Sequence, residues 1–72
     1  MLDERDAHTW QSLGLTLVGL NRYIDALEMY DRALKLRRDE PDIWRSKAAV
    51  LRELGREREA RDAERRAEKL SR

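Results

Sequence analysis

Residues that could carry acid–base chemistry are few in kind: the 72-residue chain has one histidine, His8, and 15 carboxylates. A general base needs a place within hydrogen-bond reach of its proton and a pKa tuned by its surroundings. The carboxylates alternate with arginines, a pattern typical of solvated helix faces, and we expect His8, near the chain start, to be exposed. Gly14 and Gly19 lie inside a helical pattern with no strand before them, so they do not form a phosphate-binding loop. The sequence therefore predicts no enzymatic activity.

Metal and cofactor sites are not expected either. The chain has no cysteine, which excludes disulfides and thiolate sites. A structural zinc site needs about four cysteine or histidine ligands, and the chain has only one histidine. We therefore predict no metal and no cofactor.

The charge balance limits the classes of partner that we expect. There are 16 basic and 15 acidic residues, which gives a net charge of +1. This near-neutral balance disfavours nucleic acid as a partner, although the arginine-rich second half leaves RNA binding as a weaker alternative. The start, MLDERDAHTW, is polar and unlike a secretory signal, and no apolar run approaches the roughly 20 residues that span a bilayer. We expect a cytoplasmic chain with no membrane partner.

Four helices would have to position whatever function the chain has. Apolar residues recur at three- and four-residue steps, the spacing of one helix face, first over residues 9–20 and again from Tyr23. Pro41 fits the first turn of a third helix, which Gly55 ends. A fourth helix is predicted over residues 57–70. Connections this short favour antiparallel neighbours and so two helical hairpins.

The two hairpins repeat one another in sequence. When residues 7–38 are laid over residues 41–72, 11 of 32 positions are identical. The matches that fall at expected helix contacts are Trp10 with Trp44, Ala26 with Ala60, and Ala33 with Ala67. A helix–turn–helix period of 34 residues is the signature of a repeat architecture.

The first unit, AHTWQSLGLTLVGLNRYIDALEMYDRALKL, resembles a tetratricopeptide repeat. The residues that carry the resemblance are Trp10, Leu13, Gly14, Leu17, Tyr23, Ala26, Tyr30 and Ala33. The second unit keeps Trp44, Ala48, Leu51, Ala60 and Ala67, and it departs from the family pattern at Lys47, Glu57 and Glu64. We expect these residues to pack the helices closely, with glycine and alanine at the nearest approaches and aromatic rings filling the remaining space.

The resemblance implies an all-α fold in which two helix–turn–helix hairpins stack as a short right-handed α-solenoid. Repeat one would cover about residues 7–40 and repeat two about residues 41–72, together one domain over residues 1–72. It also implies that the first helix of each hairpin lines a concave surface that binds a protein or peptide. The residues expected there are His8, Gln11, Ser12, Leu15, Val18, Arg45, Ala49 and Arg52. A mildly apolar floor with arginines at its rim favours a peptide with some negative charge.

The two ends of the predicted stack differ in character. The last helix is charged at 11 of residues 57–72, and we interpret it as a cap with a polar outer face, with an acidic partner or RNA as the alternative. The first repeat carries surplus apolar residues at Leu15, Ile24 and Met29. We therefore expect self-association through them, most simply as a homodimer. About three repeats are generally needed for stability, so two alternatives stay open: a piece of a longer array, or a designed minimal repeat protein.

Overall fold

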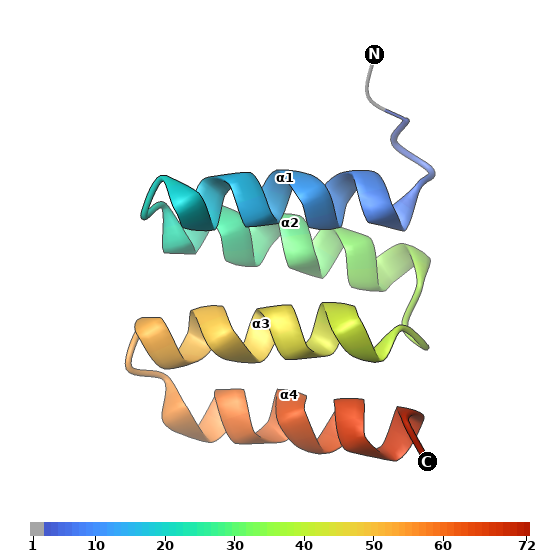
Figure 1. Ribbon diagram of the computed structural model, residues 1–72, viewed down its shortest axis with the longest axis vertical. Coiled ribbons are helices and arrows are strands. Elements are labelled where there is room, and N and C mark those ends of the chain that lie inside the picture. The colour runs from blue at the N-terminus through green and yellow to red at the C-terminus, as the bar shows by residue number, and fades with distance from the viewer. Residues whose placement is uncertain (1–2) are drawn as a thin grey trace.

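The computed structural model describes residues 3–72, and four α-helices follow one another along them (Figure 1). The helices are α1 (Ala7–Gly19), α2 (Tyr23–Leu36), α3 (Pro41–Glu53) and α4 (Glu57–Leu70). The described part of the chain contains no β-strand, so the predicted all-α fold is confirmed. The bounds of α4 are those predicted, whereas α1 begins two residues earlier than its apolar pattern indicates.

Local signals explain where the helices begin and end. α1 begins after Asp6, whose side-chain oxygen accepts a hydrogen bond from the backbone N–H of His8 at 2.9 Å. α3 begins with Pro41, whose missing N–H is not needed in the first turn. Both first helices of the hairpins are followed by a left-handed residue, Asn21 with φ of 61° and Gly55 with φ of 76°. These two residues, 34 positions apart, reverse the chain into the second helix of each hairpin.

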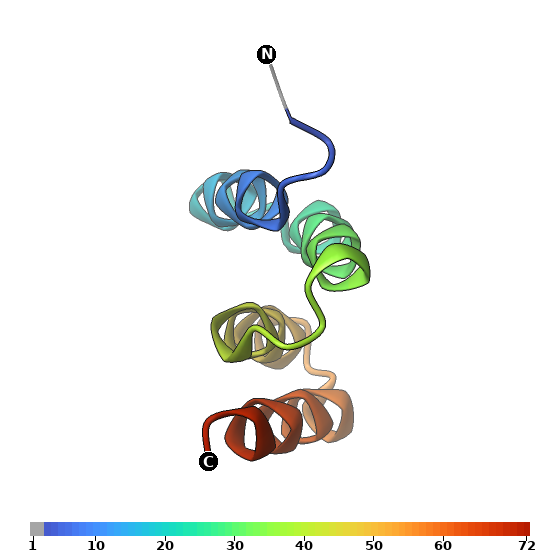
Figure 2. The same ribbon diagram turned by 90° about the vertical axis from the view of Figure 1, so that its right-hand side faces the viewer.

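Each helix packs against the next along the chain, so α1 and α2 form one hairpin and α3 and α4 the other. The backbone of α1 also approaches that of α3, whereas the backbones of α2 and α4 do not approach each other. Figure 2, which looks along the helices, shows α1 and α3 on one side of the stack and α2 on the other. One face of the stack is therefore built from α1 and α3. On the opposite face, α2 and α4 pack on either side of α3.

The core consists of two clusters with shared neighbours. The first joins α1, α2 and α3 and contains Tyr30 and Ile43, whose exposed fractions are 1% and 0%. The second joins α3 and α4, and Leu27 and Trp44 pack against both clusters. Among the residues expected from the repeat signature, those buried are Trp10, Gly14, Ala26, Tyr30, Ala33, Ala48, Leu51, Ala60 and Ala67. Those half-buried are Leu13, Leu17, Tyr23 and Trp44.

Gly14 marks the closest contact of the first hairpin. A Cβ atom at this position would lie 2.5 Å from Cε1 of Tyr30, so the tyrosine ring rests directly on the backbone of α1. The equivalent pair 34 residues later is Ala48 and Glu64. The second hairpin therefore accepts a methyl group where the first hairpin accepts none.

The α1 end of the stack differs in composition from the surface of α3 that faces repeat one. Where repeat two faces repeat one, α3 buries Ile43 and Val50 to 0% and 2% exposure. The same positions in α1 hold Thr9 and Thr16, although Leu20 nearby remains 62% exposed. The α1 end therefore combines two threonines with exposed apolar side chains.

The α4 end is polar by the same comparison. Tyr30 and Leu34 of α2 are buried towards repeat two. The equivalent positions of α4 are Glu64 and Glu68, and both are exposed. This is the polar outer face predicted for the last helix.

Each tryptophan side chain forms a hydrogen bond with the segment that precedes its helix. The indole N–H of Trp10 donates a hydrogen bond to the carbonyl oxygen of Glu4 at 3.1 Å. The indole N–H of Trp44 donates to the carbonyl oxygen of Arg38 at 2.9 Å. Since Glu4 and Arg38 are also 34 residues apart, the repeat includes the link before the first helix as well as the hairpin itself.

Candidate functional site

The residues predicted to bind a partner lie on two neighbouring helices, α1 and α3. On α1, Leu15 is 55% exposed near the middle of the helix. Val18, one turn further along, is half-buried and packs against the first core cluster. His8 and Ser12 are exposed and Gln11 is half-buried, and on α3 all three predicted residues, Arg45, Ala49 and Arg52, are exposed. The α1 part of this surface is thus a polar strip with one prominent leucine.

Arg45 turns towards the end of the chain. Its guanidinium donates to Oδ1 of Asp42 at 3.0 Å and to Oγ of Ser71 at 2.7 Å. The hydroxyl group of Ser71 in turn donates a hydrogen bond to the carbonyl oxygen of Ala67 at 2.9 Å. These bonds tie the beginning of α3 to the end of α4.

Arg52 is held by two carboxylates. Its guanidinium donates to Oε2 of Glu57 at 3.1 Å and forms an ion pair with Glu64. These hydrogen bonds raise the pKa of Arg52, and the same guanidinium lowers the pKa of Glu57. Both rim arginines of the predicted surface are therefore already paired, mostly with residues that the sequence analysis did not connect to them.

A shallow hollow of about 540 Å³ lies between these arginines and α4. Its lining residues are Arg45, Ala49, Arg52, Glu64, Glu68 and Ser71. Sequence reasoning missed the three contributed by α4 and the residue after it, because ion pairs between separate helices follow no fixed sequence spacing. The only available signal was the departure of Glu64 from the aromatic residue of the family pattern.

The large exposed hydrophobic side chains of the described residues all belong to the first repeat. They are Leu15, Leu20, Ile24 and Leu36, with exposed fractions of 55%, 62%, 64% and 42%. Of the residues predicted for self-association, Leu15 and Ile24 are in this set but lie on different helices. Met29 is half-buried and packs against the first core cluster.

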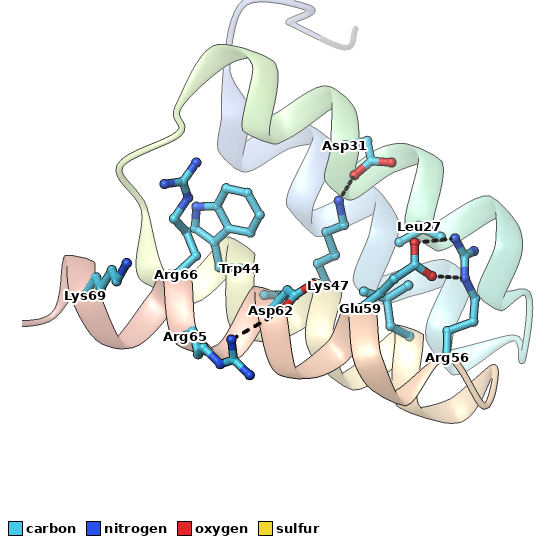
Figure 3. A pocket seen from close by; sticks show the side chains of 12 residues that line it. Leu27, Asp31, Trp44, Lys47, Arg56, Glu59, Asp62, Arg65, Arg66 and Lys69 are labelled. Atoms are coloured by element: carbon cyan, nitrogen blue, oxygen red, sulfur yellow. Dashed lines mark hydrogen bonds and ion pairs between the residues drawn. The ribbon is translucent and has the colours of Figure 1, made fainter.

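A second depression lies on the opposite side of the stack, and we call it the α2–α4 groove. It has a volume of about 550 Å³. Leu27, Trp44, Leu51 and Ala63 supply its apolar lining. Its charged lining residues come from α2, α3, α4 and the turn before α4 and are Asp31, Lys47, Arg56, Glu59, Asp62, Arg65, Arg66 and Lys69 (Figure 3). The sequence analysis did not predict this groove.

Neither a metal-binding cluster nor a membrane-spanning helix occurs in residues 3–72. These residues contain no group of three or more histidine, cysteine, aspartate or glutamate side chains arranged to hold a metal ion. None of the helices formed by these residues has both the length and the apolar character needed to cross a membrane.

Comparison with known proteins gives a consistent result. The sequence profile of the tetratricopeptide repeat family matches residues 7–50. Among curated protein sequences, no relative matches the chain.

Solved structures similar to the chain include three of MamA. MamA MSR-1 has a TM-score of 0.89 at 27% identity, over 93% of this chain and 38% of that one. MamA AMB-1 has a TM-score of 0.88 at 29% identity, over 92% of this chain and 39% of that one. A MamA point mutant has a TM-score of 0.87 at 29% identity, over 90% of this chain and 47% of that one. The chain spans less than half the length of each of these proteins.

Proposed function

We propose that this chain, which belongs to the tetratricopeptide repeat family, is a non-enzymatic module that binds a segment of another protein. Family membership and the fold it shares with MamA support an interaction module in general terms. The particular partners of longer proteins are not carried over, because the chain covers less than half of each MamA structure.

The proposed binding surface is the α1–α3 face. The observation that carries this proposal is the exposure of Leu15, which is 55% accessible near the middle of α1. We expect an apolar side chain of the partner to lie against Leu15 and over Ala49, the equivalent residue of α3, which is short and exposed. A single apolar anchor surrounded by polar residues is a common arrangement in peptide recognition.

Charged side chains contribute less to ligand binding at this surface than the sequence indicates. Arg45 and Arg52 are bound to Ser71, Glu57 and Glu64. An acidic ligand would have to compete with these partners, so exchanging one exposed ion pair for another changes the binding free energy little. We therefore propose a peptide anchored by an apolar side chain, with acidic residues secondary.

Binding to an arrayed peptide library tests the surface. We expect Leu15→Glu to abolish binding of the peptides that the unchanged protein selects, while circular dichroism remains helical. Leu36→Glu is the matched control, because it places the same charge on an exposed leucine of α2. Selected peptides that bind Leu15→Glu as well as the unchanged protein would remove Leu15 from the binding surface.

Self-association through the first repeat is the second candidate function. The observation in its favour is that the exposed large hydrophobic side chains of the described residues all lie in residues 7–40. We expect light scattering on a sizing column to give a dimer, and Ile24→Glu or Leu15→Glu to give a monomer. A mass of 8.6 kDa at every concentration would exclude this candidate.

A further inference from the structure

The α2–α4 groove follows from how the helices stack. Both α2 and α4 pack against α3, and their own backbones do not approach each other. The gap between them is lined by Leu27 from α2, Trp44 and Leu51 from α3, and Ala63 from α4. Ala63 is buried, whereas Trp44 is half-buried and keeps part of its surface accessible. This gives the groove an apolar floor with one aromatic ring.

The charges around this floor are divided along its length. Towards the start of α4, Nζ of Lys47 lies 2.7 Å from a carboxylate oxygen of Asp31 and 5.6 Å from the centre of the Trp44 ring, and Arg56 is paired with Glu59. These pairs are drawn as dashed lines in Figure 3. The four side chains therefore largely neutralise one another and leave little attraction for a ligand at this end.

The other end of the groove keeps a net positive charge. Arg65, Arg66 and Lys69 lie along the last turns of α4 on the groove side (Figure 3). The guanidinium of Arg66 lies 5.4 Å from the centre of the Trp44 ring, and in residues 3–72 no carboxylate is within ion-pair distance of Arg66 or Lys69. Arg65 has one distant partner, Asp62 at 3.8 Å. Arg66 thus lies over the aromatic ring, and Arg65 and Lys69 add positive charge along the same helix, against the single carboxylate of Asp62.

We propose that the α2–α4 groove is a second binding site, for an acidic peptide segment with an apolar side chain. The apolar side chain would lie on Trp44 and Leu27, and neighbouring carboxylates would bind Arg66 and Lys69. An ionised acceptor forms stronger hydrogen bonds with these cations than a neutral acceptor does. The site is on the opposite side of the stack from Leu15, so it does not depend on the function proposed for the α1–α3 face.

The charge pattern favours a peptide over a nucleic acid. Asp31, Glu59 and Asp62 also line the groove and would repel a continuous phosphate backbone. The net charge of the chain is only +1, whereas nucleic-acid binding domains usually carry a strong basic excess. A short acidic segment needs only the cationic end of the groove.

The two tryptophans allow a direct test. Each indole N–H gives its own signal in a ¹H–¹⁵N spectrum, and the variant Trp44→Phe assigns them. We expect a peptide of glutamates flanking one leucine to shift the Trp44 signal saturably and to leave the Trp10 signal in place. Trp10 is an internal reference outside the groove: it has one cation over its ring, Arg32 at 4.9 Å, whereas Trp44 has two, Lys47 and Arg66. The same peptide with glutamines in place of glutamates should have no effect.

Charge variants then locate the site. The double variant Arg66→Glu with Lys69→Glu should weaken binding of the glutamate peptide by about tenfold or more. Its control is Arg58→Glu with Arg61→Glu, which changes the charge of α4 equally outside the groove lining and should leave affinity unchanged. If the reversed charges disturb folding, Arg66→Gln with Lys69→Gln tests the same contacts.

Three outcomes would overturn the proposal. The first is equal weakening by the groove and control variants, which would indicate a general charge effect. The second is a Trp10 signal that moves together with that of Trp44. The third is a Trp44 signal that responds to a single-stranded uridine oligonucleotide but not to the acidic peptide, which would assign the groove to RNA.

Discussion

The two repeats have the same helical plan and the same spacing of their tryptophans, yet their outward surfaces are opposite in character. The first repeat exposes large hydrophobic side chains such as Leu15 and Ile24. The second repeat places Ala49 and Arg58 at the same positions. Inside the hairpins, Trp10, Ala26 and Ala33 are repeated as Trp44, Ala60 and Ala67, whereas Tyr30 is replaced by Glu64. The residue type at a repeat position therefore depends on what the side chain packs against. Positions that face the partner helix are constrained by packing, and outward positions are not.

The largest expected difference between the repeats is at Tyr30 and its equivalent, Glu64. Tyr30 is 1% exposed, and truncating a buried aromatic side chain costs about 3–5 kcal/mol. That loss is comparable to the whole stability of a domain this small, so Tyr30→Ala should be largely unfolded by circular dichroism. Glu64→Ala should unfold close to the unchanged protein in urea. Similar losses for both variants would mean that the α4 end is buried in solution.

The second prediction concerns the surfaces that face the neighbouring repeat. Ile43→Thr puts a hydroxyl group into a fully buried position and should cost about 2–3 kcal/mol in urea unfolding. The reciprocal change, Thr9→Ile, should leave the unfolding free energy nearly unchanged and increase self-association, because it enlarges the apolar surface at the α1 end. A stability loss on Thr9→Ile as large as that of Ile43→Thr would contradict a solvent-facing α1 end.

The third prediction concerns the nearest contact in each hairpin. Gly14→Ala should destabilise the protein by about 1–3 kcal/mol, because the new methyl group meets the ring of Tyr30. In the second hairpin Ala48 already holds this methyl group. Gly19→Ala is the control on the same helix, since nothing lies within 4 Å of a Cβ there, and it should be neutral or stabilising. The temperature of thermal unfolding should therefore fall for Gly14→Ala and should not fall for Gly19→Ala.

The smallest predicted effects are at the two turns. Asn21 and Gly55 both have positive φ, a conformation that costs an ordinary residue about 1–2 kcal/mol. Asn21→Ala and Gly55→Ala should each lower the unfolding free energy by about 1 kcal/mol. Here the repeats should behave alike, and a neutral Gly55→Ala would show that the second turn can relax into another conformation.

Much of the fold was predictable because its signals are local. Pro41 and Gly55 bound α3, and the three- and four-residue apolar spacing is enough to predict four helices. The tryptophan spacing predicts the repeat length. Each of these depends on residues within one helix or one period, so neighbouring sequence contains the necessary information.

The contacts between helices were harder to predict. Nothing in the spacing of Arg52 and Glu64 indicates an ion pair, and the α2–α4 groove exists only because α3 separates those two helices. The identical positions of the two repeats identify the repeat, but the positions that differ contain the information about its ends. It is the mismatch of Thr9 with Ile43 that identifies the polar α1 end, and a comparison of mismatches would have found it.

The polar ends have a consequence for how such a chain could lengthen during evolution. Duplicating the first repeat whole would bury threonines at the new junction, and duplicating the second would bury glutamates. A hybrid of residues 41–56 followed by residues 23–40 has the same 34-residue length and presents an apolar surface at both ends. Inserted after Glu40, it would need glycine in place of Ala48, because the ring of Tyr30 would then lie against that position. New repeats of this kind would thus be built from the two inner helices, α3 and α2.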